Sequence, residues 1–214
     1  MTESAAKKYL RTDEKGTVRC WWCGDDAEYQ RYHDKEWGRP VKNDFRLFEK
    51  ICLEGFQSGL SWLTILRKRE NFRHAFDGFD FTKVAKFNDR RVEKLLLDEG
   101  IIRHRGKIEA TINNAQKALE IAKEFDSLAK YIWQWEPDIR EPDIGKTDNQ
   151  IPNIPNVTQT STNLSRDLKK RGWKFFGPTT AYAFMQACGL VNDHLVGCKM
   201  HKEVDALRTK FKRP

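Results

Sequence analysis

The sequence contains no long hydrophobic run. None of its apolar stretches approaches the roughly 18 residues that a membrane-spanning helix needs, and residues 1–17 are polar and charged, unlike a secretory signal. It also lacks internal repeats, low-complexity tracts and strand-hairpin signals. Its five cysteines are an odd number, which favours reduced thiols or metal ligands over a disulfide framework. These absences exclude a membrane protein and predict a cytoplasmic, nucleoid-associated location.

The 214 residues carry a formal net charge of +8 and a pI near 9.2. Clustered Lys and Arg neutralise phosphates and release their counterions, so this balance favours a nucleic-acid partner. Charge alone is weak support, because many basic proteins have a solvated basic face and bind no nucleic acid. The length suits one compact unit with a sizeable core, and we expect a monomer.

The hydrophobic pattern is helical almost throughout. Apolar residues recur at three and four positions, and helix starts are marked by the capping residues Asn43 or Asp44, Ser61, Asp80, Asn88, Ser161 or Thr162, and by Pro178 in a first turn. Residues 136–160 are polar and proline-bearing, which predicts an irregular connection. We therefore predict an all-α domain over residues 19–198, with a disordered or frayed leader at 1–18 and a basic C-terminal tail at 199–214.

One stretch, residues 51–62, places a carboxylate and a tryptophan among apolar and small residues. A helix that ends at Gly55 would carry Glu54 into low-dielectric surroundings, where a carboxylate is usually kept for recognition or proton transfer. Trp62 would supply a stacking face for a planar ligand. The alternative is that Glu54 is a solvated helix-end acid and Trp62 a core aromatic.

A short, basic, glycine-bearing turn joins two predicted helices at residues 96–108. Its backbone N–H groups and helix N-terminus could bind a phosphate without reading sequence. The residues that would contribute to this phosphate binding are Arg103, Arg105, Gly106 and Lys107. A plain helical hairpin with a solvated basic tip is the competing interpretation.

Two pairs of soft ligands lie near opposite ends of the chain, Cys20 with His33 and His194 with Cys198. Two thiolates and two imidazoles would hold a tetrahedral zinc ion with no open position, so one structural Zn²⁺ is predicted to join the two ends. Cys23 is a rival ligand, because its spacing from Cys20 suits a zinc knuckle that excludes His33.

Taken together, these residues resemble the 3-methyladenine DNA glycosylase I family of the helix-hairpin-helix glycosylase superfamily. The resemblance runs from about Arg19 to Cys198 and rests on several motifs in one order. They are Tyr-His-Asp-Lys-Glu-Trp-Gly at 32–38, Ile-Cys-Leu-Glu-Gly at 51–55, Gly-Leu-Ser-Trp at 59–62, Gly-Ile-Ile-Arg-His-Arg-Gly-Lys-Ile at 100–108, Lys-Lys-Arg-Gly-Trp-Lys-Phe at 169–175 and Phe-Met-Gln-Ala-Cys-Gly-Leu-Val-Asn-Asp-His at 184–194. The leader, Trp21, Cys23 and the basic tail depart from the family pattern.

The resemblance implies a particular metal site and a particular pocket. Zinc would be held by Cys20, His33, His194 and Cys198, which favours His33 over Cys23. The base pocket would contain Trp22, Tyr29, Tyr32, Glu54 and Trp62, and the DNA-binding element would be a helix-hairpin-helix motif. The implied activity is excision of 3-methyladenine from double-stranded DNA by base flipping, as a step of base excision repair.

The chemistry of such a base fits these residues. A base methylated at N3 is cationic, so its glycosidic bond is already weakened and recognition can do much of the catalysis. Glu54, the expected catalytic residue, would accept hydrogen bonds from the exocyclic amine and the N7 edge, while Trp62 stacks on the cationic ring. Gly59 and Leu60 would fill the gap that the flipped nucleotide leaves.

No lysine has surroundings that suggest a Schiff-base nucleophile, which predicts a monofunctional glycosylase that leaves an abasic site. No residue can be assigned from the sequence to the task of activating water. The alternative is a non-catalytic, zinc-containing nucleic-acid-binding protein, which would share the hairpin and the charge but give Glu54 no specific task.

Overall fold

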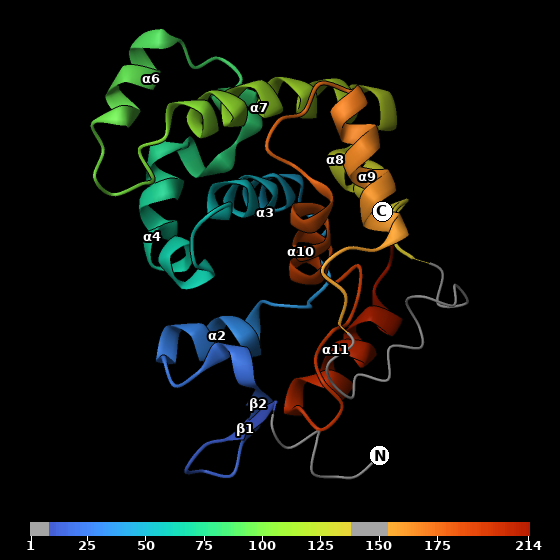
Figure 1. Cartoon of the computed structure of the whole chain (residues 1–214). Coiled ribbons are helices and arrows are strands. Elements are labelled where there is room, and N and C mark those ends of the chain that lie inside the picture. The colour runs from blue at the N-terminus through green and yellow to red at the C-terminus, as the bar shows by residue number, and fades with distance from the viewer. Residues whose placement is uncertain (1–8, 138–153) are drawn as a thin grey trace.

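A computed structural model describes residues 9–137 and 154–214. The chain is mostly helical, as the sequence predicts, with a small two-stranded sheet near the N-terminus (Figure 1). The elements are β1 (Leu10–Thr12), β2 (Val18–Cys20), η1 (Trp21–Cys23), α2 (Ala27–Lys35), α3 (Asp44–Gln57), α4 (Trp62–Ala75), η2 (Asp77–Phe79), α5 (Phe81–Val84), α6 (Asp89–Leu96), α7 (Arg105–Phe125), α8 (Leu128–Trp133), α9 (Gln159–Lys170), α10 (Pro178–Cys188) and α11 (Lys199–Lys210).

The predicted helix starts are confirmed at most positions. The side chains of Asn43, Ser61, Asp80 and Asn88 each accept a backbone N–H from the first turn of their helix, and Pro178 is the first residue of α10. These contacts satisfy donors that the helix itself leaves unpaired. Helix α9 begins earlier than predicted, at Gln159, because Thr158 caps it in a reciprocal pair with Ser161. Most of the predicted connection at 136–160 lies outside the described residues.

Helix α3 forms the centre of the core. Ten consecutive residues of it, Leu47 to Phe56, are buried, and α4, α7, α8 and α10 all pack against it. Figure 1 shows α3 enclosed between α7 on one side and α10 on the other. A helix covered on several sides carries its polar groups into the interior, so Glu54 is buried even though the helix runs on past it.

The predicted helix stop at Gly55 is wrong, because α3 continues to Gln57. Gly55 instead permits a close approach by another segment. A Cβ atom at this position would lie 3.3 Å from the carbonyl oxygen of Phe175. Its role is therefore in packing, and Glu54 and Gln57 both lie in the last turns of one helix.

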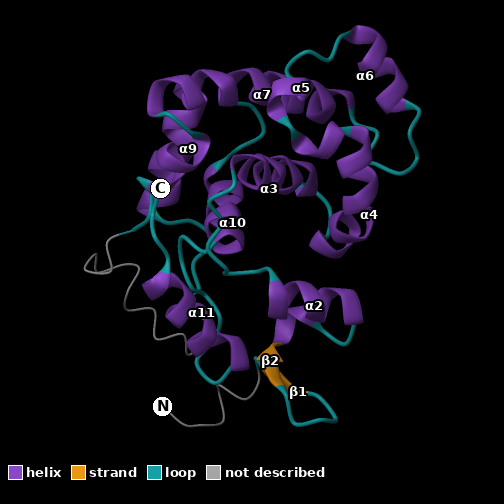
Figure 2. Cartoon of the chain, turned by 180° about the vertical axis from the view of Figure 1, so that it is seen from behind, coloured by secondary structure: helices purple, strands orange, loops and turns teal. Residues whose placement is uncertain are grey.

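The N-terminal leader is not frayed over its described part. Residues 10–12 pair antiparallel with residues 18–20, and this β1–β2 hairpin lies beside α2 and α11 in both views (Figure 2). Tyr9 and Leu10 pack on the small core formed by Cys20, Leu195 and Met200. Strands of three residues are too short to show a recognisable alternation of apolar and polar residues in the sequence. The packing of Tyr9 and Leu10 on this small core stabilises them.

The predicted basic tail is also folded, as helix α11. Met200 and Val204 are buried beneath its basic outer face. Arg208 donates to the carbonyl oxygens of Gly189 and Leu190 at 3.0 and 2.8 Å, which fixes the helix to the end of α10. The sequence does not reveal this helix, because its two buried positions are too few to form an apolar stripe. Within the described segments, no helix is both long and apolar enough to cross a membrane.

Candidate functional site

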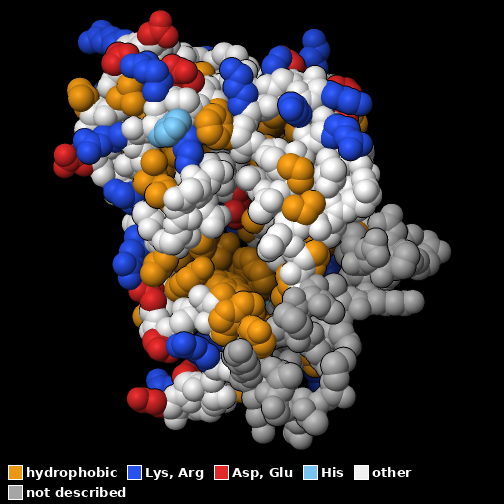
Figure 3. All heavy atoms as spheres, in the orientation of Figure 1, with side chains coloured by type: hydrophobic (Ala, Val, Ile, Leu, Met, Phe, Trp, Pro, Cys, Tyr) orange, Lys and Arg blue, Asp and Glu red, His pale blue; other side chains and the backbone are white. Residues whose placement is uncertain are grey.

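A cavity of about 400 Å³ opens between the α3–α10 core and the segment formed by α2 and the β1–β2 hairpin. The surface is hollowed here, and hydrophobic side chains line the hollow (Figure 3). Its walls combine many aromatic rings with a few polar groups, as is usual for a small-molecule pocket. The lining residues are Tyr9, Trp21, Trp22, Tyr29, Tyr32, Trp37, Glu54, Gln57, Trp62, Ile154, Asn156, Ala183 and Gln186.

Glu54 is the carboxylate of this cavity, where only 5% of its surface is exposed. Burial raises its pKa from 4.5 to about 8, and the charge of Lys50, one turn earlier on α3, opposes this only in part. No hydrogen bond reaches the carboxylate from the described residues, so its acceptor capacity is directed at the cavity. An uncompensated buried carboxylate is costly to a fold and typical of a ligand-binding group.

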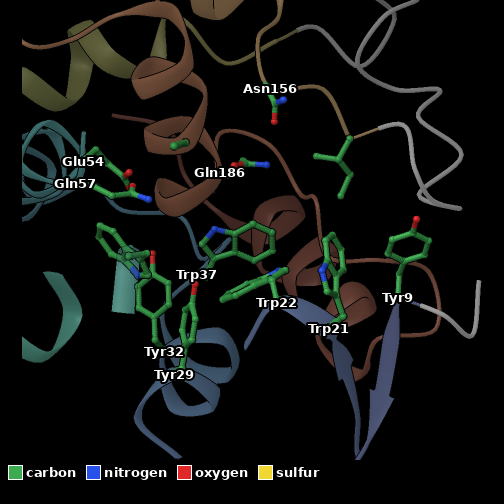
Figure 4. Close-up of a pocket in the computed structure, with 13 residues that line it drawn as sticks. Tyr9, Trp21, Trp22, Tyr29, Tyr32, Trp37, Glu54, Gln57, Asn156 and Gln186 are labelled. Carbon is green, nitrogen blue, oxygen red and sulfur yellow. The ribbon is translucent and has the colours of Figure 1, made fainter. Parts of the chain in front are cut away.

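The four aromatic residues predicted with Glu54 line the same cavity. The Tyr32 ring lies 5.3 Å from Trp62 and 6.4 Å from Trp22, and Trp22 lies 5.1 Å from Tyr29, measured between ring centroids. Figure 4 shows Glu54 above Tyr29 and Tyr32, with Trp22 beyond them. Burial raises the pKa of Tyr29 to about 12, so its hydroxyl stays a neutral donor at physiological pH.

Several lining residues were missed by the sequence analysis. Gln57 follows Glu54 by three positions, a spacing that puts both on one helical face and could have identified it. Trp37 and Gln186 lie inside two of the family-like motifs without having been given a role. Tyr9 and Trp21 come from the supposed leader and its border, so no sequence signal pointed to them.

The four predicted metal ligands meet in one buried cluster. The side-chain ligand atoms of Cys20, His33, His194 and Cys198 all lie within 4.8 Å of one another. Cys198 Sγ is 3.5 Å from His33 Nε2 and 3.7 Å from His194 Nδ1, and Cys20 Sγ is 3.9 Å from His194 Nδ1. A tetrahedral site with ordinary zinc bond lengths has sulfur–nitrogen separations of about 3.6 Å. The cluster could therefore hold a metal ion.

The other nitrogen of each imidazole is fixed by a second group. His33 Nδ1 lies 2.8 Å from Asp34 Oδ1, and His194 Nε2 lies 3.1 Å from the carbonyl oxygen of Trp37. Carboxylate and carbonyl partners of this kind orient metal-ligating histidines and set their tautomer. Burial raises the pKa of Asp34, but hydrogen bonds from Arg19, Lys199 and His33 outweigh it and keep that pKa below its usual value.

Cys23 does not belong to the cluster. Its thiol donates to the carbonyl oxygen of Cys20 at 3.1 Å, and burial raises its pKa to about 11. The structure therefore favours His33 over the knuckle alternative, because Cys23 is not among the four residues whose ligand atoms gather in the cluster.

The basic turn between α6 and α7 is exposed at Arg103 and Arg105. Arg105 pairs with Glu93 at 2.6 Å on the surface, and Arg103 lies 3.6 Å from Glu99. Exposed pairs of this kind are weak, so both guanidiniums remain available to an anion. Gly106 lies in the first turn of α7, beside the His104 side chain.

Lys107 differs from the prediction. Its ammonium points into the protein and donates to the carbonyl oxygens of Phe56 and Ser58 at 2.9 and 2.6 Å. Burial lowers its pKa below the usual value. The Lys107 ammonium therefore binds the carbonyl groups at the end of α3, a contact that does not support the predicted phosphate contact of this side chain.

Gly59 and Leu60 lie in the loop after α3, directly beyond the cavity residue Gln57. Gly59 has a φ of +82°, a conformation that favours glycine. Leu60 exposes 41% of its surface. Leu60 therefore presents an apolar side chain to solvent close to the cavity residue Gln57.

These features define a class of protein. An aromatic cavity with a buried carboxylate, in a helical protein that also has an exposed basic inter-helix turn, suits the binding of a nucleobase. The model of the Methyladenine glycosylase family matches residues 22–202, and the chain therefore belongs to that family.

Individual relatives agree with this assignment. DNA-3-methyladenine glycosylase 1 of Escherichia coli (strain K12) is 49% identical over 180 residues, which cover 84% of this chain and 95% of that protein. A crystal structure of 3-methyladenine DNA glycosylase I superposes with a TM-score of 0.79 at 48% identity, covering 86% of this chain and 99% of the other. The Staphylococcus aureus enzyme, solved to explain its recognition of 3-methyladenine, gives a TM-score of 0.77 at 36% identity over 86% of this chain and 96% of its own.

Proposed function

We propose that the protein is a monofunctional DNA glycosylase that flips 3-methyladenine out of double-stranded DNA and hydrolyses its N-glycosidic bond. The observation that supports this most directly is the buried carboxylate of Glu54, which has no partner among the described residues and opens into an aromatic cavity. A cationic base supplies the missing partner, and ionisation of Glu54 is favoured as the base enters. A neutral adenine gains less from this contact.

The roles within the pocket follow from its geometry. Glu54 accepts a hydrogen bond from the exocyclic amine on the N7 edge of the base, and Trp62 covers one face of the ring. Trp22, Tyr29 and Tyr32 complete the aromatic enclosure, whose ring spacings of 5.1–6.4 Å are those of a packed cluster. Excluding water from this enclosure strengthens the attraction between carboxylate and cation. The product released is free 3-methyladenine.

Binding to the duplex involves two neighbouring elements. Arg103, Arg105 and the backbone at Gly106 hold a phosphate from the α6–α7 turn, acting as a helix-hairpin-helix motif. Gly59 and Leu60 occupy the space that the flipped nucleotide vacates. Its DNA substrate places such an enzyme in the cytoplasm, at the nucleoid.

The buried cluster fits one structural Zn²⁺ bound by Cys20, His33, His194 and Cys198. Two sulfurs and two nitrogens at tetrahedral separations, each imidazole held by a second partner, are the donor set that zinc prefers. With four protein ligands no position is open to water, so the ion would hold the chain ends together and take no part in hydrolysis.

The test is release of free base from DNA treated with a methylating agent. Wild-type protein loaded with zinc should release 3-methyladenine and no adenine. Glu54→Ala should lose excision and keep its affinity for the duplex, because the change lies inside the pocket. Absence of release by the wild-type protein would favour the non-catalytic binding protein, and unchanged release by Glu54→Ala would refute the pocket assignment.

A further inference from the structure

The cavity has two ends, and the proposed activity uses only one of them. Glu54, Gln57, Tyr29 and Tyr32 gather at one end, whereas Trp21 and Tyr9 stand at the other (Figure 4). Ile154 and Asn156 line the cavity as well, and Asn156 lies above the gap between Trp22 and Trp21 in the same view. Tyr9 and Trp21 precede residue 22, where the match to the family model begins. The two aromatic residues of this end therefore lie outside the matched segment, whereas Ile154 and Asn156 lie within it.

The second end is preorganised. The backbone N–H of Trp21 donates to the carbonyl oxygen of Tyr9 at 3.0 Å, and the two rings meet edge to face with centroids 5.3 Å apart. Tyr9 also packs on the small core around Cys20. Trp21 nevertheless exposes 39% of its surface, so a large aromatic face remains open beside the cavity.

The chemistry of adenine sets which substituent would reach this end. N7 and the exocyclic amine share one edge of the ring, and N3 lies on the opposite edge beside the glycosidic nitrogen. A base that presents its amine and N7 to Glu54 therefore turns N3 away from that carboxylate. The direction away from Glu54 leads past Trp22 and Trp37 toward Trp21 and Tyr9 (Figure 4). A cavity of about 400 Å³ is also in the size range that takes drug-sized ligands and not single rings alone.

We propose that this pocket accepts adenines whose N3 substituent is larger than methyl, in particular an aromatic one such as benzyl. The substituent lies against Trp21 and Tyr9 while Glu54 holds the opposite edge of the base. This inference rests on the proposed glycosylase function and extends its substrate class. The reaction is unchanged: the C1′–N9 bond breaks, its electron pair stays on N9 and neutralises the cationic base, and water adds to C1′ with loss of one proton.

The experiment compares two substrates prepared from the same duplex, one alkylated with a methylating agent and one with a benzylating agent. Release of 3-methyladenine and of N3-benzyladenine is measured for the zinc-loaded full chain by chromatography and mass spectrometry. The wild-type protein should release both bases. Trp21→Ala should lower the ratio of benzyl to methyl release by about tenfold, the loss expected for one aromatic contact. Tyr9→Ala should lower it in the same direction.

Phe45→Ala is the matched control, because Phe45 exposes 38% of its surface and lies outside the cavity lining. It should leave the ratio unchanged. Release of 3-methyladenine without N3-benzyladenine by the wild-type protein would overturn this proposal and leave the proposed function standing. Release of neither base would overturn both. If Trp21→Ala lowers the release of both bases equally and leaves the ratio unchanged, the hairpin contacts the DNA and not the N3 substituent, and the proposal is overturned.

Discussion

The ammonium nitrogen of Lys107 lies 2.6 Å from the carbonyl oxygen of Ser58, so the first turn of α7 is tied to the end of α3. The same nitrogen binds the Phe56 carbonyl at 2.9 Å. Helix α3 supplies Glu54 and Gln57, and α7 begins at the basic turn. One buried cation thus connects the proposed phosphate-binding turn to the pocket.

Lys107→Met should destabilise the protein by about 2 kcal/mol, because it removes two hydrogen bonds from a charged donor and leaves two helix-end carbonyls unpaired. For a domain of this size the melting temperature should fall by about 5 °C. Thermal unfolding followed by circular dichroism measures the change.

Salt dependence distinguishes this structural role from a phosphate contact. Each phosphate contact contributes about 0.9 to the slope of log affinity against log salt concentration. Arg103→Met, the control at an exposed cation of the same turn, should lower that slope by about 0.9 and leave stability nearly unchanged. A similar loss of slope for Lys107→Met, without a loss of stability, would contradict the internal contacts.

Glu54→Gln should make the protein more stable at high pH. Burial raises the pKa of Glu54 from 4.5 to about 8, so the folded protein favours the protonated carboxyl. The free energy of unfolding of the wild-type protein therefore falls as pH rises from about 4.5 through about 8, while glutamine has no charge to bury. Urea unfolding at pH 5 should show similar stabilities, and at pH 9 the variant should be more stable by a few kcal/mol. Equal pH dependence in the two proteins would mean that the carboxylate is solvated.

The same titration should have the opposite effect on activity. The carboxylate that reads a cationic base must be ionised, so kcat/KM for methylated DNA should rise with pH through a value near 8, the pKa of Glu54 in the free enzyme. Steady-state release of 3-methyladenine across pH 6–9.5 measures the profile. A rate that falls over this range would indicate that Glu54 acts as a proton donor instead.

His33→Ala should lose the metal ion and several kcal/mol of stability, because three ligands bind zinc far less tightly than four and binding free energy is folding free energy here. Cys23→Ala is the matched control in the same segment, and it should retain one zinc per chain with only a small loss of stability. Elemental analysis and thermal unfolding with and without a chelator measure both effects. If His33→Ala retains zinc and Cys23→Ala loses it, Cys23 and not His33 is the ligand, as in the zinc-knuckle alternative.

Gly189→Ala should destabilise the protein by about 3 kcal/mol or more. Gly189 ends α10 with a φ of +76°, and an added Cβ would lie 2.6 Å from both Gly38 O and Pro40 N, which are backbone atoms that cannot move aside freely. Gly78→Ala is the control, because Gly78 has a φ of +69° with no atom within 4 Å of an added Cβ. Gly78→Ala should lower the free energy of unfolding by only about 1 kcal/mol, which is the cost of holding a residue with a Cβ atom at a positive φ. Equal losses in chemical denaturation would show that the close approach has no effect.

Local signals in the sequence identified the helices well. A capping side chain such as Asn43 or Ser61 acts within its own first turn, so its effect does not depend on the rest of the fold. The sequence also identified the four residues that form the buried Cys/His cluster, because their residue types are rare and chemically specific. Membership of the family was evident from the ordered motifs.

Apart from the start of α9, which a local cap determines, the errors depend on contacts between distant segments. Gly55 was read as a helix stop, whereas Phe175, 120 residues later, determines why it is glycine. Lys107 was counted among surface cations because nothing near it in sequence reveals that Phe56 and Ser58 end a helix beside it. The β1–β2 hairpin and α11 each fold against the other terminus of the chain. Such tertiary contacts override the secondary-structure preference of the local sequence.

A metal ion bound by the Cys/His cluster would act as a reversible cross-link between the two ends of the chain. An ion held there would close a loop from Cys20 to Cys198, which spans nearly the whole described chain, and long loops lose the most entropy when an unfolded chain is tied. The link would also fix Trp22, whose ring lies 5.1 Å from that of His33, as part of the pocket wall. Withdrawal of zinc would then loosen the aromatic wall while the α3–α7 core stayed folded, so the availability of the metal would govern repair without any zinc at the reacting bond.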